Sequence, residues 1–355
     1  MLLQGKATAS KPHVLAGETF SLDIEVVNFG RTPVTLHGME ELIPCCGMEL
    51  MTASDKQPLE GSYLDLNGKT LEPSTTEKLK FTARALEKGT YSISPRLVYV
   101  VGEGNQKILG LNPATVEVEE VVLPNRVNSG YIELDNLLFG GLPEKYSIAL
   151  TSIACDETKL LIKRFVEKGA REGEITFLIT VETRRWEKLA KEFPSVSLFI
   201  CNPQAETTME ALPNVVKIRG VESLTDINIP LFSALTKLKA SNGKPRRICI
   251  EILSDILLQH RAAQTRRWLT GLITELRSNG FTVLALLNPY MHPAEDGQAV
   301  LDLFDGEIEV YETNDQKFLR IRRMYEQDYI ENELPLRRNK LLTTGVAREL
   351  RYHSY

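Results

Sequence analysis

The stretch ALTSIACDETKLLIKRF, residues 149–165, has the outline of a strand, a polar loop and a helix that could grip a phosphate. An apolar run leads into the loop, and Leu161 and Phe165 follow it at helical spacing. A phosphate-binding loop uses glycines because their backbone N–H groups can converge on the anion. This loop instead carries side chains: Ser152, Cys155, Asp156 and Glu157. The stretch is therefore a phosphate site, the remains of one, or an ordinary turn.

The cysteines are weaker candidates for chemistry. Cys155 would stand at a helix N-terminus, where the pKa of a thiol falls, but the flanking Asp156 and Glu157 would raise it again. We therefore expect an inert thiol. The five cysteines include no CxxC pair, and the adjacent Cys45 and Cys46 are either redox-active or, as we expect, reduced thiols.

The five histidines give a zinc site little support, because they show no HxH or HExxH spacing. His292 follows a predicted strand in NPYMHPAED, at the end of an α/β sheet where ligands bind. With Tyr290 and Glu295 it could line a pocket. The alternative, which we favour, is an ordinary loop histidine.

The bulk composition narrows the class of protein. A length of 355 residues suits two domains, and 43% hydrophobic with 25% charged residues is ordinary for a globular chain. The net charge of −5 argues against a general nucleic-acid binder. No apolar run reaches the roughly 18–20 residues that span a bilayer. The few apolar residues before Gln4 and Lys6 are too short for a signal peptide, so we expect a cytoplasmic protein.

The first 122 residues show the period of a half-buried strand. In FSLDIEVVNF, alternate residues share one apolar face: Phe20, Leu22, Ile24 and Val26. The pattern recurs in EKLKFTARA and GTYSISPRLVYV, with turn signals such as Asn67-Gly68 between the strands. These features predict an all-β antiparallel sandwich over residues 1–122. The same stretches resemble immunoglobulin-like modules of the CARDB type, a resemblance that implies a fold and no ligand.

A linker is expected at residues 123–130, which contain Pro124, Asn125 and Gly130. Beyond it, apolar strands such as KYSIALTSI, ITFLITVE, RRICIEIL and FTVLALLN alternate with amphipathic helices. This order predicts an α/β domain over residues 131–335 with a mostly parallel central sheet. We expect a closing hairpin around Asn314-Asp315 and a basic docking tail at residues 336–355.

The segment SGYIELDNLLFGGLPEKYSIAL, residues 129–150, is similar to a segment of the KaiC-like branch of RecA-type ATPases. The family pattern is T-G-x-x-x-h-D-x-L-h-G-G-G-h-P-x-G, where h is hydrophobic. The residues in register are Gly130, Leu134, Asp135, Leu138, Gly140, Gly141, Leu142 and Pro143, while Lys145 replaces a usual glycine. The resemblance continues in family order to residue 346. It implies a RecA-like fold, a class that binds ATP and Mg²⁺, but we assign this chain no cofactor because its phosphate loop is altered.

The resemblance lays residues 152–159 on the family's phosphate loop. In this register Ser152, Cys155 and Glu157 replace glycines. Thr158 takes the place of the phosphate-binding lysine, and Lys159 that of the Ser/Thr that holds Mg²⁺. Asp156 and Glu157 would set carboxylates beside a polyanion, which is unfavourable. A shift of one residue would let Lys159 serve as the phosphate lysine, but it would break the match to the following helix.

The resemblance also implies roles for residues further along the chain. Glu182 keeps half of a glutamate pair of which one member activates water, and Thr183 replaces the other. Glu251 in ICIE stands where the family has an aspartate that holds Mg²⁺. The candidates for reaching a neighbouring subunit's γ-phosphate are Arg320, Arg322 and Arg323, with solvated strand residues as the alternative.

Three functions remain open from the sequence. We favour a non-catalytic or weakly active RecA/KaiC-like protein that regulates or assembles through protein partners or self-association. The second is an atypical Mg·ATP-binding ATPase, built on Lys159, Glu182 and Glu251, whose nucleotide state controls oligomerisation or partner binding. The third is a nucleic-acid-associated RecA relative, against which the acidic balance stands.

Overall fold

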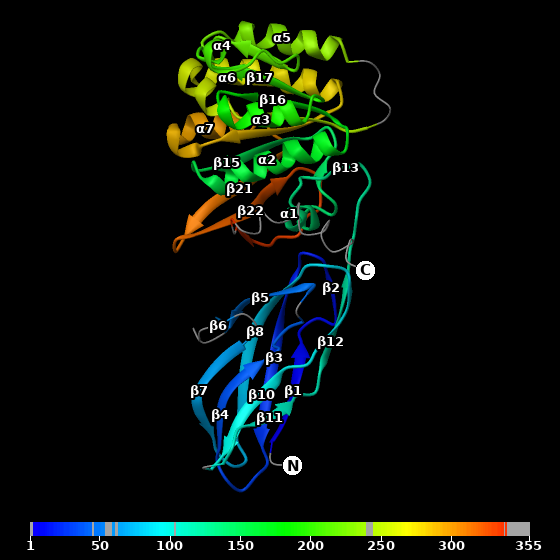
Figure 1. Ribbon diagram of the computed structural model, residues 1–355, viewed down its shortest axis with the longest axis vertical. Coiled ribbons are helices and arrows are strands. Elements are labelled where there is room, and N and C mark those ends of the chain that lie inside the picture. The colour runs from blue at the N-terminus through cyan, green and yellow to red at the C-terminus, as the bar shows by residue number, and fades with distance from the viewer. Residues whose placement is uncertain are drawn as a thin grey trace. The chain divides into compact units, whose positions relative to one another are not determined.

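The computed structural model describes residues 3–44, 46–53, 59–60, 63–102, 104–238, 244–336 and 338. The chain divides into two compact units, Met1–Val122 and Leu123–Tyr355 (Figure 1). The first unit has one hydrophobic core, and the second has two that lie apart.

The first unit is built from strands. Three sheets have the strand orders β1-β3-β8-β5, β11-β10-β4-β7-β6 and β2-β12-β9. Neighbouring strands are antiparallel except for the pair β2 and β12. The strands are β1 (Leu3–Ala9), β2 (His13–Leu15), β3 (Thr19–Asn28), β4 (Val34–Glu40), β5 (Met48–Ala53), β6 (Leu59–Glu60), β7 (Tyr63–Leu71), β8 (Thr76–Ala85), β9 (Gly89–Ile93), β10 (Arg96–Val101), β11 (Lys107–Gly110) and β12 (Ala114–Glu119).

The period-two pattern of the first unit is confirmed in its central strands. The predicted inward residues of β3, from Phe20 to Val26, are buried, and they lie beside Leu79 and Phe81 of the neighbouring strand β8 in the same core. The stretch GTYSISPRLVYV does not form one continuous strand. It forms β9 and β10, which lie in different sheets with Pro95 between them. Proline has no N–H to donate to a ladder, so the strand ends there.

A nine-stranded sheet forms the centre of the second unit (Figure 1). Its order is β18-β17-β16-β19-β20-β15-β21-β22-β23; the strands from β18 to β21 run parallel, and β22 and β23 are antiparallel additions. The predicted mostly parallel sheet is thus confirmed. The strands are β15 (Ser147–Ser152), β16 (Ile175–Thr180), β17 (Val196–Cys201), β18 (Val215–Ile218), β19 (Arg246–Ile250), β20 (Phe281–Leu287), β21 (Gly306–Thr313), β22 (Gln316–Met324) and β23 (Leu334–Pro335). A separate pair joins β13 (Arg126–Val127) to β14 (Leu142–Pro143).

Helices cover both faces of this sheet, because alternate strand residues pack into two different cores. Leu178 of β16 packs in one core, and its neighbours Phe177 and Ile179 pack in the other. The first core takes residues of α1, α2 and α3, and the second takes residues of α5, α6 and α7. The helices are α1 (Ile132–Leu137), α2 (Asp156–Arg171), α3 (Arg184–Glu192), α4 (Ala205–Thr208), α5 (Leu224–Thr236), α6 (Leu253–Ser278, kinked at Arg261), the 3₁₀ turn η1 (Pro289–Met291) and α7 (Ala294–Leu301).

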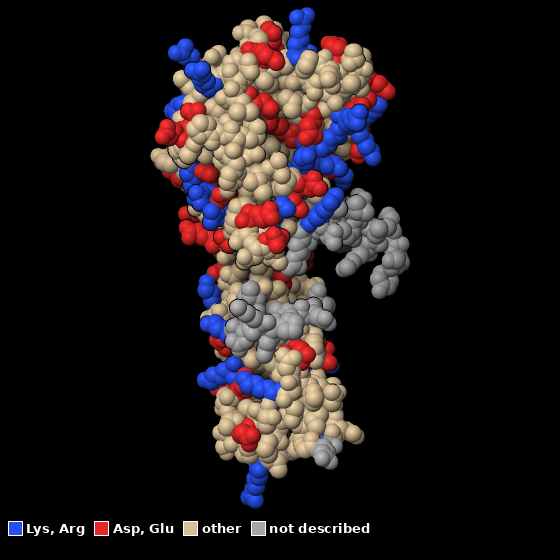
Figure 2. Space-filling view, turned by 90° about the vertical axis from the view of Figure 1, so that its left-hand side faces the viewer, with Lys and Arg blue, Asp and Glu red and all other residues tan. Residues whose placement is uncertain are grey.

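The closing hairpin is confirmed between β21 and β22. Asn314 and Asp315 form its turn with φ of 50° and 58°, the left-handed conformation that such tight turns require. Among the described helices, none is long and apolar enough to cross a membrane. On the face shown in Figure 2, Lys and Arg are interspersed with Asp and Glu, so that this face carries both signs of charge.

Candidate functional site

The loop between β15 and α2 is a short turn. Ser152 ends β15, residues 153–155 make the connection, and α2 begins at Asp156. Cys155 has extended dihedral angles (φ −144°, ψ 161°), and residues 146–172, all of them described, contain no positive φ. Thr158 and Lys159 therefore lie in the first turn of α2, close to the end of β15.

Three side chains fill the inside of this turn. Thr158 and Ser152 are each 2% exposed, and their hydroxyl oxygens are 2.5 Å apart. The Cys155 Sγ lies 3.1 Å from Thr158 Oγ1, and the Ser152 hydroxyl donates to the Ile153 carbonyl at 2.6 Å. Because Ser152 uses its proton on Ile153, the Thr158 hydroxyl donates to Ser152, and Cys155 donates to Thr158. Three residues of the predicted phosphate-loop register, Ser152, Cys155 and Thr158, thus form one continuous chain of hydrogen bonds that ends on the Ile153 carbonyl.

The two carboxylates of the turn face cations of this same chain. Glu157 Oε2 lies 3.7 Å from Lys317 Nζ on β22, and Asp156 Oδ2 lies 3.5 Å from an Arg338 guanidinium nitrogen. Glu157 is largely buried, while Asp156 and Arg338 are exposed. The N-terminal end of α2 therefore carries negative side chains that pair with Lys and Arg of the same chain. Arg338 belongs to the predicted basic tail, of which only Leu336 and Arg338 are described.

Glu182 and Glu251 come together around a residue that the sequence analysis did not single out. Arg185 Nε lies 3.1 Å from Glu182 Oε2, and its Nη2 donates to Glu251 Oε1. The second oxygen of Glu251 accepts from the Trp186 indole N–H at 3.0 Å. Lys159 Nζ stands 3.9 Å from Glu182 Oε1. The i,i+3 spacing of Glu182 and Arg185 was the available signal for Arg185, while the family resemblance had already implied that Lys159, Glu182 and Glu251 share one site.

The strand order explains this convergence. β16 and β19 are parallel neighbours in register, with Ile179 opposite Ile250, so both strands end at the same edge of the sheet. Glu251 follows β19 directly, and its N–H donates to the Ile179 carbonyl at 2.8 Å. α3 starts just after β16 and turns Arg185 back toward that edge. Burial raises the pKa of Glu251, and the charge of Arg185, with hydrogen bonds from Thr180 and Trp186, offsets part of the rise.

The three arginines of β22 are occupied by glutamates of the adjacent strand. Arg320 Nε donates to Glu309 Oε2 at 2.6 Å, and the guanidinium lies 4.5 Å from the Tyr311 ring centroid. Arg322 reaches the same Glu309 oxygen at 3.6 Å. Arg323 lies 3.9 Å from a Glu307 oxygen and donates to the Leu301 carbonyl at 2.6 Å. All three thus have partners within their own chain.

The remaining candidates do not form an enclosed site. His292 is half-buried and faces Asp255 and Asp296, and burial lowers its pKa, whereas Tyr290 is 80% exposed and Glu295 is exposed. Cys45 lies outside the described residues, and Cys46 is exposed. Within the described part of the chain, no cluster of three His, Cys, Asp or Glu side chains could hold a metal ion.

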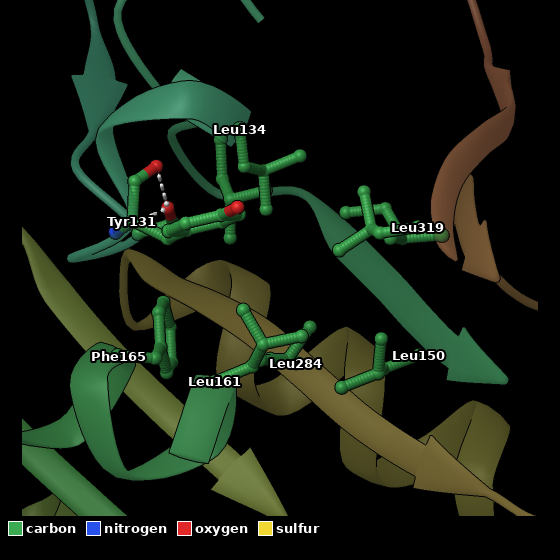
Figure 3. Close-up of a pocket in the computed structure, with 10 residues that line it drawn as sticks. Tyr131, Leu134, Leu150, Leu161, Phe165, Leu284 and Leu319 are labelled. Atoms are coloured by element: carbon green, nitrogen blue, oxygen red, sulfur yellow. Dashed lines mark hydrogen bonds between the residues drawn. The ribbon is translucent and has the colours of Figure 1, made fainter. Parts of the chain in front are cut away.

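A small apolar cavity lies on the α1 and α2 side of the sheet (Figure 3). Ser129 supplies its polar lining, while Tyr131, Leu134, Leu161 and Phe165 are among its apolar walls. The nearby Asp135 is 4% exposed and accepts the Ser129 N–H at 2.7 Å, and its Oδ2 has no partner. Burial raises the pKa of Asp135 to about 7, in spite of the hydrogen bonds from Ser129.

The strand order and the strand–turn–helix at its centre define an α/β unit of the RecA-type ATPase class. A family model described as "ATPase: KaiC" matches residues 127–329, more than half of the chain. The chain therefore belongs to the KaiC ATPase family.

The solved structures that are similar to this chain include a KaiC-like protein from the hyperthermophilic archaeon Pyrococcus horikoshii OT3, with 21% identity and a TM-score of 0.43. The match covers 59% of this chain and 93% of that one. No curated protein matches the sequence.

Proposed function

We propose that this chain is a non-catalytic or weakly active KaiC family member that regulates or assembles through protein contacts. The observation that carries the proposal is the hydrogen-bonded chain of Cys155, Thr158 and Ser152 at the phosphate-loop position. A phosphate loop must leave its interior to the anion and offer converging N–H groups. Here three side chains occupy that interior, and the residue in the lysine register is a buried threonine.

The charges at the turn support the same proposal. A nucleotide brings several negative charges, and Asp156 and Glu157 would repel them at the point of closest approach. In a phosphate site of this fold, a lysine reaches the β- and γ-phosphates from the start of the helix. Lys159 is displaced by one residue and lies beside Glu182 instead.

The donor set fits a Mg²⁺ ion poorly. Both oxygens of Glu251 already accept hydrogen bonds, from Arg185 and Trp186, and its side chain is 7% exposed. Mg²⁺ needs near-octahedral oxygen ligands and keeps several waters, for which a carboxylate must be free. A guanidinium between Glu182 and Glu251 repels a second cation. We therefore assign no metal-dependent step to these residues.

One observation favours the alternative, an atypical ATPase whose nucleotide controls assembly. The Lys159 side chain is about half exposed, and its partner Glu182 is held at 3.9 Å by a weak, solvated ion pair. Such a lysine is free to leave Glu182 for a phosphate. Titration calorimetry with Mg·ATP and a phosphate-release assay separate the two functions.

The wild type, Lys159→Ala and the matched control Lys163→Ala are compared in those assays. Lys163 lies one turn further along α2 and pairs with Glu167 on the surface. The proposal expects no saturable Mg·ATP binding at micromolar concentrations, and at most a weak turnover that is the same in all three proteins. Micromolar binding with turnover that falls in Lys159→Ala but not in Lys163→Ala would establish the alternative.

The remaining parts of the proposal concern the whole chain. We infer a cytoplasmic protein whose strand-rich first unit is an immunoglobulin-like (CARDB-type) sandwich and whose partners are proteins or copies of itself. The charges of both signs in Figure 2 fit protein contacts better than a nucleic-acid track. Light scattering with and without Mg·ATP tests the assembly role. We expect a molar mass that does not depend on nucleotide.

A further inference from the structure

We propose that the Arg185 guanidinium takes the place of a metal ion between Glu182 and Glu251. Its removal would open a divalent-cation site at these two carboxylates. This inference deepens the proposed function. Its test uses a metal ion without nucleotide, so the two proposals can fail separately.

The arrangement is balanced in charge without any ligand. Glu182 and Glu251 supply two negative charges, and Arg185 and Lys159 supply two positive ones within 4 Å of them. A carboxylate as buried as Glu251 is costly unless a partner neutralises it. Arg185 provides that partner from inside the chain, so the two strand ends need no external cation.

The geometry of Arg185 is that of a fixed group. Its Nη2 donates a hydrogen bond to Glu251, its Nε forms an ion pair with Glu182 at 3.1 Å, and the guanidinium lies 4.6 Å from the centroid of the buried Trp186 ring. The side chain is 21% exposed, compared with 51% for Lys159. A planar guanidinium can bridge two carboxylates and stack on an aromatic ring together, which an ammonium group cannot do. Arg185 therefore fixes the ends of β16 and β19 to the start of α3.

Removing this side chain would leave two carboxylates facing a vacated volume. Carboxylate oxygens are the ligands that hard divalent cations prefer, and the Thr180 hydroxyl beside Glu251 adds another oxygen. The excess negative charge at that point would attract a cation. With few protein ligands, the expected affinity for Ca²⁺ or Mg²⁺ is weak, about 10⁻⁴–10⁻³ M.

Terbium luminescence provides the test, because Trp186 is the natural sensitiser. Its indole nitrogen is 3.0 Å from a Glu251 oxygen, so a Tb³⁺ ion bound there would be excited through this ring. Arg185→Ala should gain at least tenfold in saturable Tb³⁺ luminescence over the wild type, and excess Ca²⁺ should compete it away. Arg184→Ala is the matched control, since Arg184 is the adjacent, exposed arginine of α3 and should behave as wild type.

Two further variants locate the ion. Glu251→Gln in the Arg185→Ala background should abolish the signal. Trp186→Phe in that background should remove the luminescence excited through the ring, because the other tryptophan, Trp268, packs in the opposite core. Equal luminescence in wild type and Arg185→Ala, or a signal that survives Glu251→Gln, would overturn the proposal.

The test holds even if Arg185→Ala does not fold in metal-free buffer. The same variant with millimolar Ca²⁺ or Mg²⁺ should then recover a cooperative thermal transition, because the ion replaces the missing positive charge. The Arg185→Ala/Glu251→Gln variant, which needs no such charge, should fold without metal. Failure of the ion to restore folding while that double variant folds would show that no cation site forms.

Discussion

At the scale of single residues, Gly169 on α2 shows how a missing side chain makes room for a buried one. A Cβ added there would come within 2.5 Å of the Arg247 Cδ and Nε atoms and 2.6 Å of Thr176 Oγ1. Arg247 is fully buried and donates to the carbonyls of Asn128 and Phe165 and to Glu174. Because Gly169 has no side chain, the buried Arg247 side chain can lie against α2 at this position.

Gly169→Ala should destabilise the second unit by about 1–3 kcal/mol, because Arg247 cannot move without breaking its hydrogen bonds. Gly271→Ala is the matched control, since nothing lies within 4 Å of a Cβ at that helical position. It should be neutral or stabilising by about 0.5–1 kcal/mol, since alanine favours a helix. Urea unfolding curves measure both; loss of stability in neither variant would contradict the packing argument.

Asp135 should make the stability of the second unit depend on pH. Its pKa is about 7 in the folded state, against 3.8 for an ordinary aspartate, because the carboxyl group is buried. A raised pKa contributes stability that is fully present below pH 4 and is lost as the pH rises through 7. Relative to Asp135→Asn, the wild type should lose up to about 4 kcal/mol over that range, at about 1.36 kcal/mol per pKa unit. Urea unfolding at several pH values measures the difference; parallel curves would rule this behaviour out.

At the scale of elements, the sequence predicted the strands and helices well, because their residues repeat with fixed periods. The central strands of the parallel sheet are apolar on both faces, and α2 begins at the end of the polar turn, as its pattern indicates. The short strands β13, β14 and β18 were missed, because strands of two to four residues show no period. The contacts of Arg185 were also missed, since they depend on the adjacency of β16 and β19, which lie 65 residues or more apart in sequence. Topology decides such contacts.

The buried ion pair of Glu174 and Arg247 ties elements together in the same way. Glu174 precedes β16, and Arg247 lies in β19 beneath α2. Glu174→Ala should cost about 3–5 kcal/mol, because it leaves a buried guanidinium without its counter-charge. Glu167→Ala, which removes the partner of a Lys163 pair on the surface of α2, should cost less than about 1 kcal/mol. Similar losses in both variants, measured by chemical unfolding, would refute the distinction.

At the scale of the whole molecule, the two units should unfold as two separate thermal transitions. The two units have separate hydrophobic cores, so a substitution in the core of one unit should leave the melting temperature of the other unchanged. Gly169→Ala should lower the melting temperature of one transition. Gly5→Ala, whose Cβ would come within 2.5 Å of Leu111 Cδ2, should lower the other. Differential scanning calorimetry of the full chain reports both; a single transition shifted by either change would show that the units unfold together.

The place of β15 between β20 and β21 also affects the order in which the two units can fold during synthesis. β15 ends at Ser152, but its two neighbours in the sheet end only at Leu287 and Thr313. During synthesis, the first unit can therefore fold as soon as its strands have left the ribosome, whereas β15 waits for more than a hundred further residues. Through that interval we expect its apolar strand to lack its neighbours in the sheet, and an unpaired apolar strand makes a partly synthesised chain prone to aggregate.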